Sequence, residues 1–170
     1  MGDSQPNVIQ YVTEWTASYE DTRAYFTQIP PESYIPTLKE LIWSPDGVIG
    51  HRAMWILHLV SPEVALEEFL RIESGRLFAD SERPTLYEFL SDYDDQRCRV
   101  LFRKALDEDP NPEVRVVAAL GLGKVGVLED IDQLLRAKEH DRTVIWSGHS
   151  VGGVAEDAVN LIRERLLPNG

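Results

Sequence analysis

Hydrophobic residues recur at helical spacing along almost the whole chain. Apolar and aromatic side chains three or four positions apart predict one or two amphipathic helices between residues 7 and 29, and further helices over 32–43, 48–60 and 62–73. Pro30-Pro31 and the turn-forming Ser44-Pro45-Asp46-Gly47 separate these segments, and residues 75–84 predict a long loop. Alternation typical of a strand is confined to the short stretch 143–146. The pattern therefore predicts an all-α fold.

Internal matches suggest that these helices form a repeat. Residues 126–136 match residues 153–163 at an offset of 27, and residues 60–71 match residues 125–136 at an offset of 65. Two apolar residues followed by arginine occur at 69–71, 101–103, 134–136 and 161–163. We expect each apolar doublet to form the buried layer of the second helix of a pair. Such pairs must stack, because their apolar stripes are too wide to be covered within one pair.

The stretch from Asp109 to Gly126 combines Asp-Pro, Val-Arg, two alanines, Leu-Gly and a closing glycine. This order resembles the first helix of a bacterial HEAT-like repeat, an armadillo-type α-solenoid family. The resemblance implies a solenoid of about four helix pairs within a single domain, residues 1–170. On this interpretation residues 44–167 form the repeats, and residues 1–43 form an N-terminal helical block that caps the first repeat.

The chain is strongly acidic. Its 170 residues include 17 Lys and Arg against 29 Asp and Glu, which gives a formal net charge of −12. This balance argues against binding to nucleic acid or to an anionic membrane, and favours a basic partner. The single cysteine, Cys98, excludes an intrachain disulfide, and residues 1–6 lack the basic and apolar segments of a signal peptide. We therefore expect a cytoplasmic protein, and no motif predicts a cofactor.

Acidic residues recur at matching places in the predicted second helices. Stacking of the repeats would align them into an acidic strip. This strip is either a solvated face or a docking surface for a basic protein. Its predicted members are Glu67, Glu68, Glu129, Asp130, Asp132, Glu156 and Asp157.

Other candidate sites have weaker support. Residues 148–153, Gly-His-Ser-Val-Gly-Gly, resemble the nucleophile elbow of an α/β-hydrolase with Ser150 as nucleophile, but no histidine follows Ser150 to act as base. We interpret this segment as a Gly-rich repeat helix or loop, and predict no catalytic residue. His51 and His58 lack a nearby third ligand, so no metal site is predicted. The four tryptophans are expected in the core, with one or two of them as alternative partner anchors.

The leading functional interpretation is a non-enzymatic protein–protein interaction module. A specific version is a bacterial immunity or inhibitor protein that neutralises a basic toxin through electrostatically steered association. The alternative is enzymatic, because the resemblance extends to HEAT-like bilin lyases and DNA glycosylases. A glycosylase would need a basic concave face, and the recurrent charges here are negative.

Overall fold

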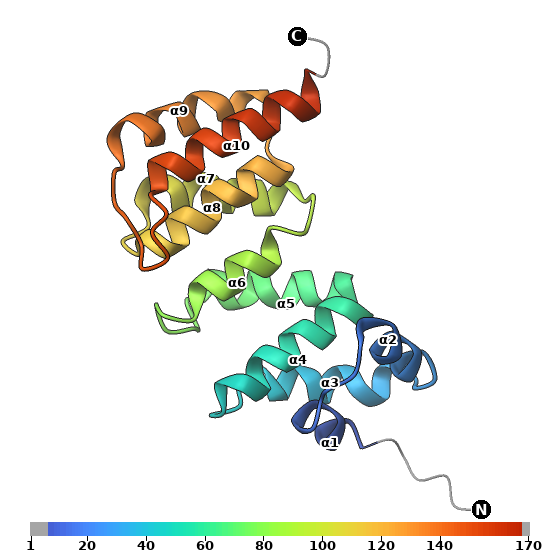
Figure 1. Ribbon diagram of the computed structural model, residues 1–170. Coiled ribbons are helices and arrows are strands. Elements are labelled where there is room, and N and C mark those ends of the chain that lie inside the picture. The colour runs from blue at the N-terminus through green and yellow to red at the C-terminus, as the bar shows by residue number, and fades with distance from the viewer. Residues whose placement is uncertain (1–6, 168–170) are drawn as a thin grey trace, which may run out of the picture. The chain divides into compact units, whose positions relative to one another are not determined.

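The computed structural model (Figure 1) describes residues 7–167. Residues 1–6, on which the expectation about a signal peptide rests, and residues 168–170 lie outside the described part. Within it the chain forms ten α-helices and one short 3-10 helix, and no strand. The prediction of an all-α fold is confirmed. No helix in the described range combines the length and the apolar character needed to cross a membrane.

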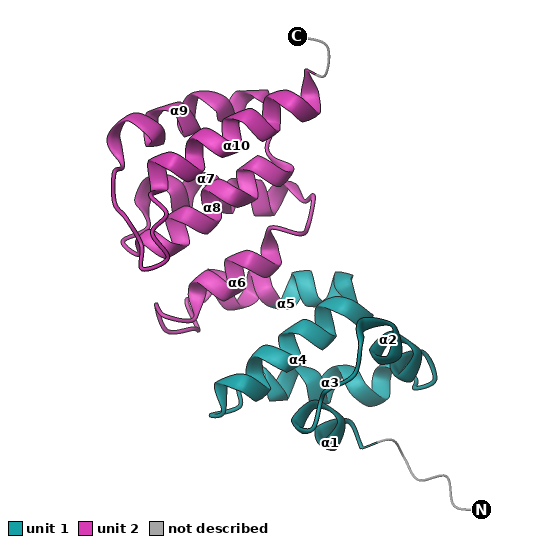
Figure 2. Cartoon of the chain, in the orientation of Figure 1, with its two compact units in different colours: residues 1–68 teal, residues 69–170 magenta. Residues whose placement is uncertain are grey.

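The chain divides into two compact units, residues 1–68 and 69–170, shown in different colours in Figure 2. This division falls within the helix Pro62–Ser74. In unit 1, α4 packs against α2 and α3, and α1 packs against α3 and α4, so the N-terminal block and the first predicted repeat share one core. The helices of unit 1 are α1 (Val8–Thr13), α2 (Tyr19–Thr27), α3 (Pro31–Leu41), α4 (Gly47–Val60) and the first half of α5 (Pro62–Ser74).

Unit 2 is built around α8. This helix packs against α6, α7 and α10, and α10 packs in turn against α9 (Figure 1). The elements are the end of α5, then α6 (Arg83–Leu90), α7 (Gln96–Glu108), α8 (Pro112–Val125), η1 (Leu128–Asp130), α9 (Ile131–His140) and α10 (Val151–Leu166). The helix carrying the repeat-like motif, α8, thus has packing partners both before it in the chain, α6 and α7, and after it, α10.

The sequence of α8 explains its central position. Asn111 caps the helix by accepting a hydrogen bond from the Glu113 amide at 2.9 Å, and Pro112 occupies the first turn. Ala118 and Ala119 are fully buried. A β-carbon at Gly121 would lie only 2.7 Å from the Phe102 ring. Small side chains therefore allow neighbouring helices to approach α8 closely.

The predicted repeat offset of 27 residues does not correspond to equivalent elements. Residues 126–136 comprise a connecting loop, η1 and the first half of α9, whereas residues 153–163 lie entirely within α10. In each apolar doublet only one of the two residues is buried, because successive side chains on a helix point about 100° apart. The buried members are Phe69, Phe102, Leu134 and Ile162.

A different recurrence is present in the ion pairs of unit 2. The Arg83 side chain at the start of α6 is 1% exposed and donates to Oδ2 of Asp109, the residue that caps the end of α7, at 2.5 Å. Arg115 on α8 donates to Oδ2 of Asp141, which caps the end of α9, at 2.7 Å. Each pair joins residues 26 positions apart. The same type of ion pair therefore links α6 to the end of α7, and α8 to the end of α9.

Candidate functional site

A groove in unit 2 is the best candidate for a binding site. It lies between α6, α8, the start of α10 and the loop that precedes α10, and it has a volume of about 460 Å³. We call it the Trp146 groove. Its apolar lining comes from Pro84, Val116, Val117, Leu120, Ile145, Trp146 and Val154, and its polar lining from Ser81, Thr85, Glu88, Glu113, Ser147, His149 and Asp157.

One wall of the groove is a hairpin formed by residues 141–151. The Ile145 amide donates to the His149 carbonyl oxygen at 2.9 Å, and the Val151 amide donates to the Thr143 carbonyl oxygen at 3.0 Å. Gly148 has a φ of +87°, a conformation that favours glycine at the turn. The β-prone stretch 143–146 forms a single isolated bridge, between Val144 and Ser150, and no regular strand. The hairpin is therefore well defined by backbone hydrogen bonds although it belongs to no sheet.

Trp146 lies at the turn of this hairpin, and 86% of its surface is exposed. The expectation that tryptophans pack in the core is wrong for Trp146, because the central residues of a tight turn project away from the protein. Trp43 is also exposed, at 42%, whereas Trp15 and Trp55 are half-buried. Trp146 leaves a large aromatic surface exposed beside the apolar groove.

Three carboxylates surround this apolar surface. Glu88 on α6, Glu113 in the first turn of α8 and Asp157 on α10 all line the groove. None of the three forms a side-chain ion pair with another residue in the described range. No lysine or arginine is among the lining residues. The groove therefore offers uncompensated negative charge beside apolar contacts.

The predicted acidic strip is not a continuous exposed surface. Glu68 is 2% exposed and lies 2.7 Å from the Lys39 ammonium, and Asp130 is 1% exposed and accepts a hydrogen bond from Arg103. Glu156 is exposed and pairs with Lys138 at 2.7 Å. Three of the seven predicted carboxylates are therefore already engaged in ion pairs within the chain.

The other four predicted residues are exposed, but only one of them lines the groove. Glu67 lies on α5 in unit 1, Glu129 in η1 and Asp132 on α9, and Asp157 is the one in the Trp146 groove. Sequence reasoning missed Glu88 and Glu113. No periodicity marks them, because they come from different helices that meet only through packing.

Ser150 has a structural role. Its hydroxyl oxygen accepts a hydrogen bond from the Gly153 amide at 3.0 Å and so caps α10. The neighbouring His149 directs Nδ1 to the Ser147 hydroxyl, 2.9 Å away. Because no strand precedes Ser150 within residues 7–167, the nucleophile-elbow interpretation is wrong. Residues 148–150 belong to the loop before α10, and residues 151–153 form the first turn of α10.

Neither the single cysteine nor a metal-ligand group within residues 7–167 provides a further candidate site. Cys98 is fully buried, and burial raises the pKa of its thiol to about 12, so the thiol is neutral near pH 7. Among the described residues no three His, Cys, Asp or Glu side chains come together as a metal-ligand group.

A second cavity, of about 270 Å³, lies beside Arg83. The buried charged groups that line it bind one another: Arg83 donates to Glu73 at 2.7 Å and to Asp109, and the Tyr87 hydroxyl donates to Glu73 at 3.1 Å. Arg76, Lys104 and Glu108 also line the cavity and lie outside this network. Hydrogen bonding to Glu73, opposed by burial and reinforced by Asp109, raises the pKa of Arg83. Arg83, Glu73, Asp109 and Tyr87 therefore form a satisfied structural network, and the larger Trp146 groove is the candidate site.

Comparison of the chain with protein-family models, with curated proteins and with solved structures gave no match.

Proposed function

We propose that the protein is a protein-binding module and that the Trp146 groove receives a basic segment of its partner. The observation that carries the proposal is the position of Trp146, almost fully exposed on a hydrogen-bonded hairpin and beside three carboxylates without ion-pair partners. Tryptophan is among the residues that most often dominate the energy of protein interfaces. Its exposure leaves apolar area that a partner can bury.

The hairpin favours binding because it is already ordered. Fixing a flexible loop at an interface costs about 0.5–1.5 kcal/mol for each immobilised side chain. The backbone hydrogen bonds between residues 143 and 151 and between 145 and 149 hold the turn before a partner arrives. A partner therefore meets Trp146 in an established position.

The charge of the groove defines the partner. Glu88, Glu113 and Asp157 attract a lysine- or arginine-rich segment, and the net charge of −12 extends the attraction to longer range. Such association becomes weaker as salt screens the charges. An inhibitor of a basic toxin is one protein of this class.

The HEAT-like solenoid remains part of this proposal. It is supported by the packing of α7 with α8 and of α9 with α10, and by the recurrence of the Arg83–Asp109 connection at Arg115–Asp141. Repeat arrays of this kind present a row of equivalent helices to extended partners. In unit 2 this row would be α6, α8 and α10, the helices that line the groove.

The proposal can be tested by selecting peptides from a random display library with the full chain. We expect enriched peptides to place lysine or arginine next to an aliphatic or aromatic residue. Trp146→Ala should weaken their binding by about thirtyfold, since truncation of an interface hot spot costs about 2 kcal/mol or more. The matched control is Trp43→Ala, which removes an exposed tryptophan outside the groove and should leave the affinity unchanged.

A triple variant tests the charge. Glu88→Gln, Glu113→Gln and Asp157→Asn together should weaken binding at low salt and flatten its salt dependence. Selection of acidic or neutral peptides, or equal binding by wild type and Trp146→Ala, would overturn the proposal.

A further inference from the structure

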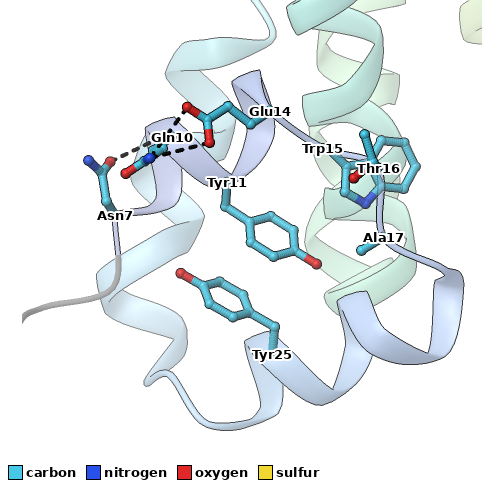
Figure 3. Close-up of a pocket in the computed structure, with 8 residues that line it drawn as sticks. All are labelled: Asn7, Gln10, Tyr11, Glu14, Trp15, Thr16, Ala17 and Tyr25. Atoms are coloured by element: carbon cyan, nitrogen blue, oxygen red, sulfur yellow. Dashed lines mark hydrogen bonds between the residues drawn. The ribbon is translucent and has the colours of Figure 1, made fainter.

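Unit 1 contains a separate pocket whose chemistry suits an organic cation (Figure 3). It has a volume of about 350 Å³ and lies between α1, α2 and the segment that joins them. Figure 3 shows Tyr11 and Tyr25 lying over each other, with Gln10 and Glu14 on the α1 side and Trp15 in the segment leading to α2. None of these residues belongs to the Trp146 groove.

The aromatic wall of this pocket is held in place. The Tyr11 and Tyr25 rings are stacked with centroids 4.1 Å apart and planes inclined by 13°. Thr22, which is fully buried, accepts hydrogen bonds from the Trp15 indole at 2.9 Å and from the Tyr11 hydroxyl at 3.2 Å. One buried hydroxyl thus orients both an indole and a phenol, and the pocket needs little reorganisation before it binds a ligand.

Glu14 supplies the negative charge. Its two carboxylate oxygens accept long hydrogen bonds, 3.3 Å each, from the Gln10 amide, and it forms no ion pair with any described residue. The guanidinium of Arg52 is held by the backbone of α1, since its Nη1 donates to the Thr13 carbonyl oxygen at 2.5 Å, and it forms no ion pair with Glu14. No lysine or arginine lines the pocket. A carboxylate beside aromatic rings therefore lacks a cation.

We propose that this pocket binds a guanidinium group, presented as an arginine side chain. A guanidinium stacks flat on an aromatic ring and donates parallel hydrogen bonds to a carboxylate, whereas a lysine ammonium is a compact and strongly hydrated charge. Tyrosine and tryptophan faces attract such cations. Because Tyr11 and Tyr25 cover one face of each other, the guanidinium would contact an outer tyrosine face or the Trp15 ring. The inference does not depend on the Trp146 groove, since all of its residues lie in unit 1.

The test is a titration of the ¹⁵N-labelled full chain with N-acetyl-arginine methylamide. The Trp15 indole N–H resonance, assigned with the Trp15→Phe variant, reports on the pocket. We expect a saturable shift of this resonance with millimolar affinity. The lysine analogue should bind more weakly, and the neutral citrulline analogue should cause no saturable shift. Free arginine serves as a further arm, because binding equal to that of the amide would show that the polypeptide context contributes nothing.

Glu14→Gln keeps the shape of the side chain and its contact with Gln10, and should weaken binding by about tenfold, the loss expected for a charge-assisted hydrogen bond. Glu40→Gln, an exposed substitution on α3 outside the pocket, is the matched control and should leave the affinity unchanged. Equal shifts with the arginine and citrulline analogues, or equal affinity for Glu14→Gln, would overturn the proposal. Because the readout is Trp15, failure here is distinguishable from failure of peptide binding at Trp146.

Discussion

Arg83 donates two hydrogen bonds to Asp109, at 3.1 and 2.5 Å, and joins the first residue of α6 to the residue that ends α7. Both side chains are almost completely buried. Since the same guanidinium also binds Glu73, one cation satisfies two buried carboxylates. This contact fixes the ends of three helices of unit 2 relative to one another.

Replacing Arg83 with methionine is expected to destabilise the protein strongly. The substitution leaves two carboxylates buried without their cation, a situation that costs about 3–5 kcal/mol. The measurement is the free energy of unfolding in urea. Arg142→Met removes an exposed arginine in the hairpin and should change this free energy by no more than about 0.5 kcal/mol. A loss below about 1 kcal/mol for Arg83→Met would show that the network contributes little.

Gly152 is expected to tolerate no side chain. A β-carbon there would lie 2.8 Å from the Lys138 carbonyl oxygen and 3.0 Å from that of Asp141, so the start of α10 would have to move away from the end of α9. Gly152→Ala should therefore cost about 1–3 kcal/mol, measured by urea unfolding.

Gly47→Ala is the matched control, because a β-carbon at Gly47 meets no atom within 4 Å. This substitution should be neutral or stabilise the protein by up to about 1 kcal/mol, through the reduced entropy of the unfolded chain. Equal effects of the two alanines would contradict the close approach of α9 and α10.

Acidification should weaken the contact between Arg115 and Asp141. Burial opposes ionisation of Asp141, but hydrogen bonds from Arg115 and Thr143 outweigh burial and lower the pKa of this carboxyl. On acidification the unfolded state therefore takes up the proton first. The stabilisation is present above the ordinary aspartate pKa, near about 3.9, and is lost as the pH falls through the lowered value.

Asp141→Asn should cost about 1 kcal/mol at pH 7, the range of a partly exposed ion pair, and the difference from wild type should shrink as the pH approaches 3. Urea unfolding across this pH range provides the measurement. Asp107→Asn, an exposed substitution on α7, controls for the general effect of removing one negative charge. A difference from wild type that stays constant with pH would exclude this role for Asp141.

Much of the helical structure could be predicted from local patterns. The expected segments 32–43, 48–60 and 62–73 correspond closely to α3, α4 and α5, because apolar spacing and proline positions act within a few residues. Repeat alignment was less reliable. The match between residues 126–136 and 153–163 reflects similar composition in two elements of different structure, and it led to the predicted acidic strip.

The candidate site depended on tertiary structure. Glu88, Glu113 and Asp157 come from α6, α8 and α10, and only the packing of these helices brings them to one groove. Trp146 was expected in the core because its side chain is large and apolar. Its place in the turn that contains Gly148 leaves it exposed instead. The Gly-rich stretch 148–153, interpreted from the sequence as a repeat helix or loop, gave no indication that Trp146 would be exposed.

The amino-acid sequence by itself determined the all-α character, the limits of the helices between residues 31 and 74 and the excess of negative charge, because these properties depend on residue types and on neighbours a few positions apart. Only the tertiary structure decided which charges are neutralised and which remain open. Glu68 and Asp130 are buried against Lys39 and Arg103, whereas the groove carboxylates are not paired. An ion pair requires two groups within a few ångströms, and that proximity is created by packing between helices distant in the sequence.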